Sequence, residues 1–578
     1  MSFDSDSPSF KINNNQWEVY NPAVGSSVYS GVAAVGQWTH YAYSRSSGTT
    51  KIFINGIQTN SFSDTQNVGN RNCTIGAYPN DTYNWKGGIS NVRVVKGTAL
   101  YTSSFKPPTA PLTNVTNTKL LCCNNTSVGG STVTPGTITP YGSDISSSTD
   151  SPFDDPDCFQ FGEDEDQNLI KCGVYGGNSS VDGAEIYLGW EPQWILFKVI
   201  SKTDPWYIAD TMRRISTDGV DNSLLPNSTQ AENDGNWELL DVSSTGWKPT
   251  TADSKINGSG HKYIYIAMRR PDPLVAKPPE AGTDVFAIDT GSQSSNIPLF
   301  DSGFKVDFGM IKNSTGSDNW WAGSRLTQFE YIEPNRNVAG AQWSVFSFDH
   351  TEGFSQHSSY GTNYIGWMWK RHAGFDVVTY KGDGQTHRQI PHNLGKAPEM
   401  MWLKPRDSTG KWNIYHKEAN GGVNPEQWYI LLDSSAAAGV YEPIWQHTPP
   451  TATDFTVGNY TEVNDNSYSY LMMLFASVDG ISKVGSYTGN GNANGPTVPL
   501  GFAPKFILIK GWGNGNHWYV YDTTRGISSG NDQRLQLNDN GNQTSADDID
   551  TTATGFQVVS TWDQLNGNNT NYLYYAHA

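Results

Sequence analysis

The sequence has little charge, few cysteines and no long apolar run. Charged residues make up 16% of its 578 residues, and 38 Lys and Arg face 56 Asp and Glu, which gives a formal net charge of −18. Because nucleic-acid binders gain most of their affinity by neutralising phosphates with Lys and Arg, this balance argues against a nucleic-acid partner. No stretch reaches the roughly 18 apolar residues of a membrane-spanning helix, so we expect no membrane insertion.

The cysteines narrow the possible classes of protein further. There are five, an odd number without a Cys-x-x-Cys pair: Cys73, Cys122, Cys123, Cys158 and Cys172. This pattern favours neither a disulfide scaffold nor a structural zinc site. The first residues carry no basic segment followed by an apolar one, so the sequence predicts no export through a classical signal.

Turn-forming and aromatic residues, in contrast, are abundant. The sequence has 58 Gly and 30 Pro, and Phe, Trp and Tyr make up 12% of it, whereas helical periodicity is nearly absent. Short alternating runs between Gly, Asn, Asp and Pro are typical of antiparallel strands. Residues 38–58 predict a β-meander with Gly48 in its first turn and Asn55-Gly56 in its second. Residues 86–94 alternate in the same way and predict a further strand.

An internal repeat is the most informative feature. Residues 170–198 align without a gap to residues 482–510, at an offset of 312 that equals three periods of 104. The two segments share Tyr-x-Gly-Asn, Leu-Gly-x-x-Pro and a terminal Lys. A third copy between them has Tyr380, Gly382, Leu394-Gly395 and Lys404, among other matches.

The second copy is weaker. It lacks Leu-Gly-x-x-Pro and offers Asp301-Ser302-Gly303-Phe304 in its place. All four copies nevertheless have a Trp further along, at Trp206, Trp320, Trp412 and Trp518. All four also end in a Tyr-rich strand, which we expect to begin at Tyr263, Tyr364, Tyr468 and Tyr572. At about 100 residues each copy can bury its own core, which indicates tandem β-sandwiches rather than a solenoid.

The segment from about Phe10 to Phe105 resembles the concanavalin-A-like, laminin-G type of jelly roll. The residues that carry the resemblance are Trp38-Thr39-His40-Tyr41-Ala42 with Arg45, Lys51-Ile52-Phe53-Ile54-Asn55-Gly56, Ile75-Gly76 and Lys86-Gly87-Gly88-Ile89-Ser90-Asn91-Val92-Arg93-Val94. Few residues precede Trp38 compared with that family, so we expect an abbreviated domain, either trimmed or completed by another chain.

The predicted fold class is therefore all-β, with an abbreviated jelly roll followed by four tandem β-sandwich repeats. The predicted domains are 1–123 for the jelly roll, 124–165 for a Ser/Thr/Pro and acidic linker, and 166–270, 283–372 (degenerate), 374–480 and 482–578 for the repeats. The linker ends in an acidic run that includes Asp154, Asp155, Asp157 and Glu163. We interpret this run as a solvated connector, because no motif at EF-hand spacing supports calcium.

The repeats, joined to such a jelly roll by this linker, resemble structural proteins of tailed phages that infect marine bacteria, including cyanobacteria. The resemblance covers roughly residues 165–578. It implies a tail fibre, spike or horn-like appendage on the exterior of the virion, assembled in the host cytoplasm. It also implies a homo-oligomer, by preference a trimer, whose partners are other virion proteins and host-surface polysaccharide. The alternatives are a stand-alone lectin-like protein and a glycan-cleaving tailspike.

A candidate glycan site lies in the loop before the Lys86–Val94 run. The loop combines aromatic platforms with Asn and Asp side chains, as sugar recognition requires, and its candidate contacts are Tyr78, Asn80, Asp81, Tyr83 and Trp85. The alternative is that Tyr83 and Trp85 pack under the loop as part of the jelly-roll core.

No catalytic, cofactor-binding or metal-binding residues are predicted, and we expect the chain not to be an enzyme. Gly526-Ile527-Ser528-Ser529-Gly530 matches the G-x-S-x-G nucleophile motif, but the strand–turn–helix context of that motif is missing. His387, His392 and His416 lack the spacing of a zinc site and are interpreted as loop histidines.

Overall fold

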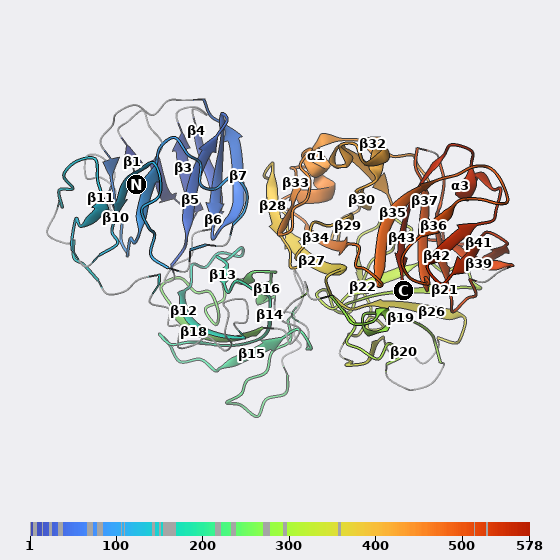
Figure 1. Cartoon of the computed structure of the whole chain (residues 1–578). Helices are drawn as coiled ribbons and strands as arrows, with labels where there is room; N and C mark the ends of the chain where they lie inside the picture. The colour runs from blue at the N-terminus through green and yellow to red at the C-terminus, as the bar shows by residue number, and fades with distance from the viewer. Residues whose placement is uncertain are drawn as a thin grey trace. The chain divides into compact units, whose positions relative to one another are not determined.

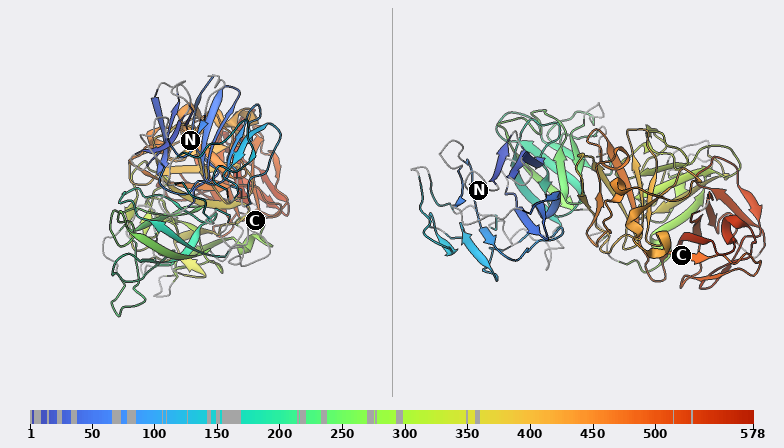
Figure 2. Two further views of the ribbon diagram at one scale, coloured as in Figure 1. Left: turned by 90° about the vertical axis from the view of Figure 1, so that its left-hand side faces the viewer. Right: turned by 90° about the horizontal axis from the view of Figure 1, so that it is seen from above.

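A computed structural model describes most of the chain. The described residues are 2–3, 9–13, 16–21, 26–32, 38–65, 73–77, 85–105, 107–108, 110–125, 127–141, 145–148, 152–153, 169–213, 215, 221–232, 238–269, 275, 278–292, 298–348, 350–355, 360–513, 515–527 and 530–578. The described elements are mainly antiparallel strands, with a few short helices (Figure 1). Two further views show the same predominance of strands (Figure 2). The predicted all-β class, with a jelly roll followed by β-sandwich repeats, is confirmed.

The chain divides into two compact units. Unit 1 comprises residues 1–188, 196–206 and 247–269, and unit 2 comprises residues 189–195, 207–246 and 270–578. The jelly roll therefore lies in unit 1, the second, third and fourth repeats lie in unit 2, and the first repeat contributes strands to both.

Among the described residues, three sheets make up the N-terminal region. The first has the order β4-β3-β2-β1-β8, the second β5-β6-β7 and the third β11-β10-β9. Their strands are β1 (Ser2–Phe3), β2 (Ser9–Asn13), β3 (Gln16–Asn21), β4 (Ser26–Val32), β5 (Tyr41–Ser46), β6 (Thr49–Ile54), β7 (Ile57–Ser63), β8 (Cys73–Thr74), β9 (Val92–Val95), β10 (Thr118–Cys122) and β11 (Ser131–Val133). Four strands thus fit into the short segment before Trp38. Strand β11 lies inside the segment for which a linker was predicted, whereas the acidic residues of that segment lie outside the described residues.

The predicted β-meander is confirmed in β5, β6 and β7. Ser47 and Gly48 have φ of 49° and 79°, and Asn55 and Gly56 have φ of 50° and 79°, so both two-residue turns use the left-handed region that favours Asn and Gly. The strand predicted over residues 86–94, however, begins only at Val92. One reason is that a Cβ on Gly88 would lie 2.6 Å from the Trp38 ring, so the backbone there packs against an indole instead of a neighbouring strand.

All four repeats share one topology. In each repeat the first strand pairs with the last, and the last pairs with the third, which pairs with the fourth. A second, smaller sheet pairs the second strand with the next-to-last.

The first repeat consists of β12 (Ile170–Gly176), β13 (Ile186–Tyr187), β14 (Pro192–Val199), β15 (Tyr207–Asp210), β16 (Leu240–Val242), β17 (Gly246–Pro249) and β18 (Lys262–Arg269). The second consists of β19 (Phe286–Thr290), β20 (Phe300–Asp301), β21 (Phe308–Asn313), β22 (Trp321–Ser324), β23 (Glu330–Tyr331), β24 (Ala341–Gln342), β25 (Gly353–Phe354) and β26 (Tyr364–Trp369).

The third consists of β27 (Phe375–Lys381), β28 (Arg388–Pro391), β29 (Met400–Pro405), β30 (Asn413–His416), β31 (Trp428–Leu431), β32 (Gly439–Val440), α1 (Glu442–Trp445), β33 (Asp454–Val457), α2 (Thr461–Asn464) and β34 (Ser469–Phe475). The fourth consists of β35 (Ser482–Thr488), β36 (Thr497–Pro499), β37 (Phe506–Gly511), β38 (Trp518–Asp522), β39 (Asp532–Gln536), β40 (Thr544–Ala546), β41 (Ile549–Thr552), β42 (Gly555–Val558), α3 (Asp563–Asn566) and β43 (Asn571–His577).

The Leu-Gly-x-x-Pro signature encodes a left-handed turn before the third strand. Its glycines, Gly189, Gly395 and Gly501, have φ of 83°, 74° and 90°. Gly303 of the degenerate copy has φ of 76°, so the predicted substitution of Asp301-Ser302-Gly303-Phe304 for the signature is confirmed.

The Tyr-x-Gly-Asn signature fixes the loop before the last strand. The hydroxyls of Tyr175, Tyr380 and Tyr487 donate to the backbone carbonyls of Ile256, Val463 and Leu565, at 2.8, 2.6 and 2.8 Å. The Tyr of the last strand donates to the same loop, from Tyr263, Tyr470 and Tyr572. In the third repeat this Tyr is Tyr470, two residues after Tyr468; β34 begins at Ser469, so the predicted start at Tyr468 was wrong by one residue.

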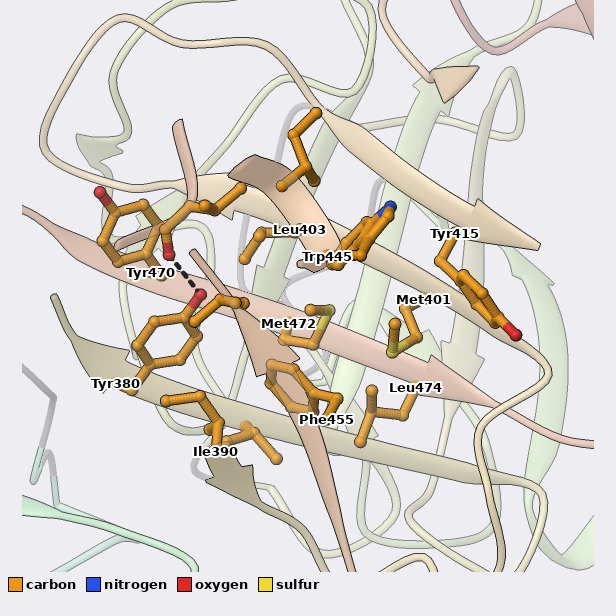
Figure 3. Packing of buried hydrophobic residues seen from close by; sticks show 14 of the residues in the cluster. Tyr380, Ile390, Met401, Leu403, Tyr415, Trp445, Phe455, Tyr470, Met472 and Leu474 are labelled. Atoms are coloured by element: carbon orange, nitrogen blue, oxygen red, sulfur yellow. Dashed lines mark hydrogen bonds between the residues drawn. The ribbon is translucent and has the colours of Figure 1, made fainter. Parts of the chain in front are cut away.

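Each sandwich buries its own aromatic and aliphatic core. In the third repeat the core includes Tyr380, Met401, Trp445, Phe455 and Tyr470, and these side chains converge between the two sheets (Figure 3). Equivalent clusters fill the second and fourth repeats.

The second, third and fourth repeats also bind one another in a closed circle within unit 2, and we call these three repeats the closed triplet. A buried Trp, at the first position of the fourth strand or directly before it, donates its indole N–H to a backbone carbonyl of another repeat. The three bonds run from Trp320 to Gln536 (2.9 Å), from Trp518 to Leu431 (2.8 Å) and from Trp412 to Glu333 (2.9 Å). The second repeat therefore donates to the fourth, the fourth donates to the third, and the third donates to the second. Figure 1 shows the three repeats in yellow-green, orange and red.

Candidate carbohydrate-binding site

Aromatic residues on three strands of the jelly roll meet between its sheets. Phe10 on β2 and Trp17 on β3 belong to the first sheet, where Ile12 pairs with Trp17. Tyr41 on β5 belongs to the second sheet. Phe10 meets Tyr41 edge to face at 5.8 Å, and Trp17 stacks on Tyr41 at 5.0 Å with an interplanar angle of 28°. Aromatic packing therefore joins the two sheets.

Trp85 extends this stack outward. Its ring lies 6.3 Å from that of Trp17 at an interplanar angle of 26°, and its side chain remains 38% exposed. Two hydrogen bonds hold the residue in place: its backbone N–H donates to the Gly76 carbonyl (2.7 Å), and its indole N–H donates to the Gly88 carbonyl (3.3 Å). Trp85 therefore presents an aromatic surface that is fixed in orientation.

Two polar atoms lie buried in the same stack. The indole Nε1 of Trp17 and the hydroxyl of Tyr41 have no hydrogen-bond partner among the described residues. Burial raises the pKa of Tyr41 well above its usual value, so the hydroxyl stays protonated and can donate. The stack thus combines apolar faces with buried polar groups that an ordered water could satisfy.

A buried carboxylate fixes the neighbouring strands. Asp64 accepts hydrogen bonds from Asn21 Nδ2 (2.8 Å), the Tyr43 hydroxyl (3.0 Å) and Thr50 Oγ1 (3.0 Å), and it pairs with Arg45 at 3.4 Å. Because these partners come from β3, β5 and β6, we interpret the network as structural support for the aromatic stack.

Of the predicted glycan contacts, only Trp85 can be placed. Tyr78, Asn80, Asp81 and Tyr83 lie outside the described residues, so the prediction for them remains a prediction. Trp85 combines the two interpretations of its loop, since it packs on Trp17 and is still partly exposed. Sequence reasoning missed Trp17, although its alternation with Val19 on one face of β3 was a usable signal.

The histidines occupy unlike positions. His416 lies in strand β30 and is buried, so its interpretation as a loop histidine was wrong. Its Nε2 lies 3.4 Å from the Tyr574 carbonyl of the fourth repeat, and burial lowers its pKa to about 4. His392 is buried after β28, and its Nε2 lies 3.2 Å from the Thr451 carbonyl. Ser528 and Ser529, the two serines of the G-x-S-x-G match, lie outside the described residues.

These observations define a concanavalin A-like jelly roll joined to four β-sandwich repeats. Residues 2–100 match the concanavalin A-like lectin/glucanases superfamily, which is consistent with carbohydrate binding and whose name covers both binding and cleaving proteins. Residues 108–271 and 346–578 match the family described as a domain of unknown function, DUF7483. Because that match spans more than half of the sequence, the chain belongs to this family. The unmatched interval lies mostly in the degenerate second repeat.

A comparison with curated proteins gives no match. Within the described residues, no helix is both long and apolar enough to span a membrane.

Proposed function

We propose that the chain binds carbohydrate through its jelly roll, at the surface formed by Trp85 on the Trp17–Tyr41 stack. The observation that carries the proposal is the orientation of Trp85, which is partly exposed, hydrogen-bonded at both its backbone and its indole, and backed by a second indole. A flat aromatic face binds the C–H face of a sugar, and nearby donors bind its hydroxyls.

Binding is tested with the full chain on an array of bacterial lipopolysaccharides and capsular polysaccharides, followed by calorimetric titration of the glycan that binds. We expect Trp85→Ala to weaken binding about fivefold or more, since loss of one aromatic platform costs about 1 kcal/mol or more. Tyr141→Ala is the matched control, because Tyr141 is a 75% exposed aromatic outside the stack. A Trp85→Ala variant that binds as tightly as the wild type contradicts the proposal.

The same incubation separates binding from cleavage. We propose binding without cleavage, so the amount of reducing ends should stay constant while glycan and protein are mixed. New reducing ends would instead place the jelly roll with the glucanases of its superfamily.

We further propose that the protein is a structural component of a phage virion appendage, a tail fibre, spike or horn-like projection that attaches to host-surface glycans. Its support is the resemblance of the tandem repeats to such proteins and an acidic, strand-rich chain suited to an exposed assembly. An antibody against the fourth repeat should label the exterior of purified virions in electron micrographs. Intact virions without label would contradict this role.

A further inference from the structure

The main sheet of the first repeat has one face against its core and one face turned outward. Tyr263, Tyr265 and Ala267 of β18 are buried on the core side. The alternating residues on the other side form what we call the outer face: Leu196 and Lys198 of β14, Ile264, Ile266 and Met268 of β18, and Cys172 of β12, which pairs with Ile266. All of them belong to unit 1.

Apart from Lys198, the outer face is apolar, and it is incompletely covered. Met268 is 39% exposed, Cys172 is exposed, and Leu196, Ile264 and Ile266 are half-buried. Contiguous apolar surface of this kind is uncommon on a soluble protein unless a partner covers it.

The equivalent positions in the other three repeats are fully buried. Met268 lies five residues after Tyr263, the Tyr shared by the last strand of each repeat. The residues at the same distance in the other repeats, Trp369, Phe475 and His577, are at most 1% exposed. The counterparts of Leu196 are Met310, Trp402 and Leu508, and those of Ile266 are Trp367, Met473 and Tyr575, and all are at most 1% exposed.

The closed triplet shows what covers this face. Phe286 of the second repeat lies 4.6 Å from His577 and 5.6 Å from Phe506 of the fourth, and Phe475 of the third lies 4.9 Å from Tyr575 of the fourth. The face is therefore buried against the same face of two other repeats.

A Lys and a Trp at the same spacing recur in all four repeats. In every repeat a Lys at the end of the third strand precedes a Trp by eight residues, at Lys198/Trp206, Lys312/Trp320, Lys404/Trp412 and Lys510/Trp518. In the closed triplet each Lys and Trp is at most 1% exposed, and each Trp donates to the next repeat. Lys198 and Trp206 of the first repeat are only half-buried.

We propose that the outer face of the first repeat binds the same face of two further copies of this chain, so that the protein is a homotrimer. The second, third and fourth repeats already close a circle within one chain. The first repeat, which carries the same face, has no place in that circle. Three first repeats from three chains can form an equivalent circle, because a head-to-tail contact that closes after three steps satisfies every copy. This interface lies outside the carbohydrate site and does not depend on the proposed glycan binding.

The oligomeric state of the full chain tests the proposal. Light scattering during size exclusion and sedimentation equilibrium should give three times the chain mass of 63.5 kDa. Met268→Glu should shift the protein to monomer, because it puts three carboxylates at the centre of the contact. Val181→Glu, at a 72% exposed apolar residue outside these strands, should remain trimeric. A wild-type monomer, dimer or tetramer, or a Met268→Glu trimer, would overturn the proposal.

The native thiol of Cys172 gives a second readout that does not depend on mass. We expect the Cys172 thiol to be alkylated at least tenfold more slowly in the wild-type trimer than in Met268→Glu. Peptide mass spectrometry measures the rate. A circular-dichroism spectrum like that of the wild type, together with a cooperative melt, shows that this variant is folded. Equal alkylation rates in the two folded proteins would overturn the proposal. Trp85→Ala should lose glycan binding and stay trimeric, so the two proposals fail separately.

Discussion

At the scale of the residue, the repeat signature contains two kinds of glycine. The glycine of Leu-Gly-x-x-Pro is needed for its positive φ, as at Gly395. The glycine of Tyr-x-Gly-Asn is needed for space: a Cβ on Gly382 would lie 1.9 Å from the Asp465 carbonyl oxygen, and the counterparts Gly177 and Gly489 would meet backbone at 2.3 and 2.4 Å. The atoms that the Cβ would meet are backbone atoms, so no flexible side chain can move aside.

We therefore expect Gly382→Ala to destabilise the protein by about 1–3 kcal/mol, the usual cost of forcing an extra methyl group into a packed site. Urea unfolding followed by tryptophan fluorescence measures the change. Gly136→Ala is the matched control, since its Cβ would meet nothing within 4 Å, and it should change stability by less than about 0.5 kcal/mol. A Gly382→Ala variant as stable as the control would show that the loop can move aside.

At the scale of the element, strands and turns could be predicted, and their pairing could not. Alternation and Asn-Gly turns located β5, β6 and β7 because both signals are local. The order of strands within each repeat depends on contacts between segments about a hundred residues apart, and no local pattern contains them. The closed triplet could not be predicted for the same reason: Trp320, Trp412 and Trp518 were recognised as equivalent, but their acceptors are backbone carbonyls, which have no sequence signature.

The candidate carbohydrate site was predictable only in part. Trp85 could be found because aromatic and amide residues cluster near it in the sequence. Trp17 and Tyr41 lie far from it along the chain and meet it only after the sheets pack. Their burial makes them resemble ordinary core residues in the sequence.

At the scale of the whole molecule, unit 2 contains neutral histidines where its repeats meet. His577 of β43 is fully buried against Phe286 of the second repeat, and its ring lies 6.1 Å from that of His372. Burial lowers the pKa of His577 to about 4 and also lowers that of His372. Lys396 and Lys370 lower the pKa of His372 further, and Lys505 lowers that of His577. A proton on either ring would thus be held in an apolar, positively charged surrounding.

The sign of the pH dependence follows from these shifts. In the unfolded chain His577 binds a proton near its usual pKa of about 6.5, whereas in the folded chain it does so only near 4. The unfolded state therefore binds more protons between these values, and the free energy of unfolding falls as the pH drops through that window, by up to about 3 kcal/mol for this residue. His577→Phe should reduce this fall, because Phe475 fills the equivalent position in the third repeat and keeps the packing apolar. Urea unfolding at pH 7 and pH 4.5 measures the difference, with the exposed His447→Gln as control. If His577→Phe and the wild type lose equal stability on acidification, the acid sensitivity of unit 2 comes from its carboxylates instead.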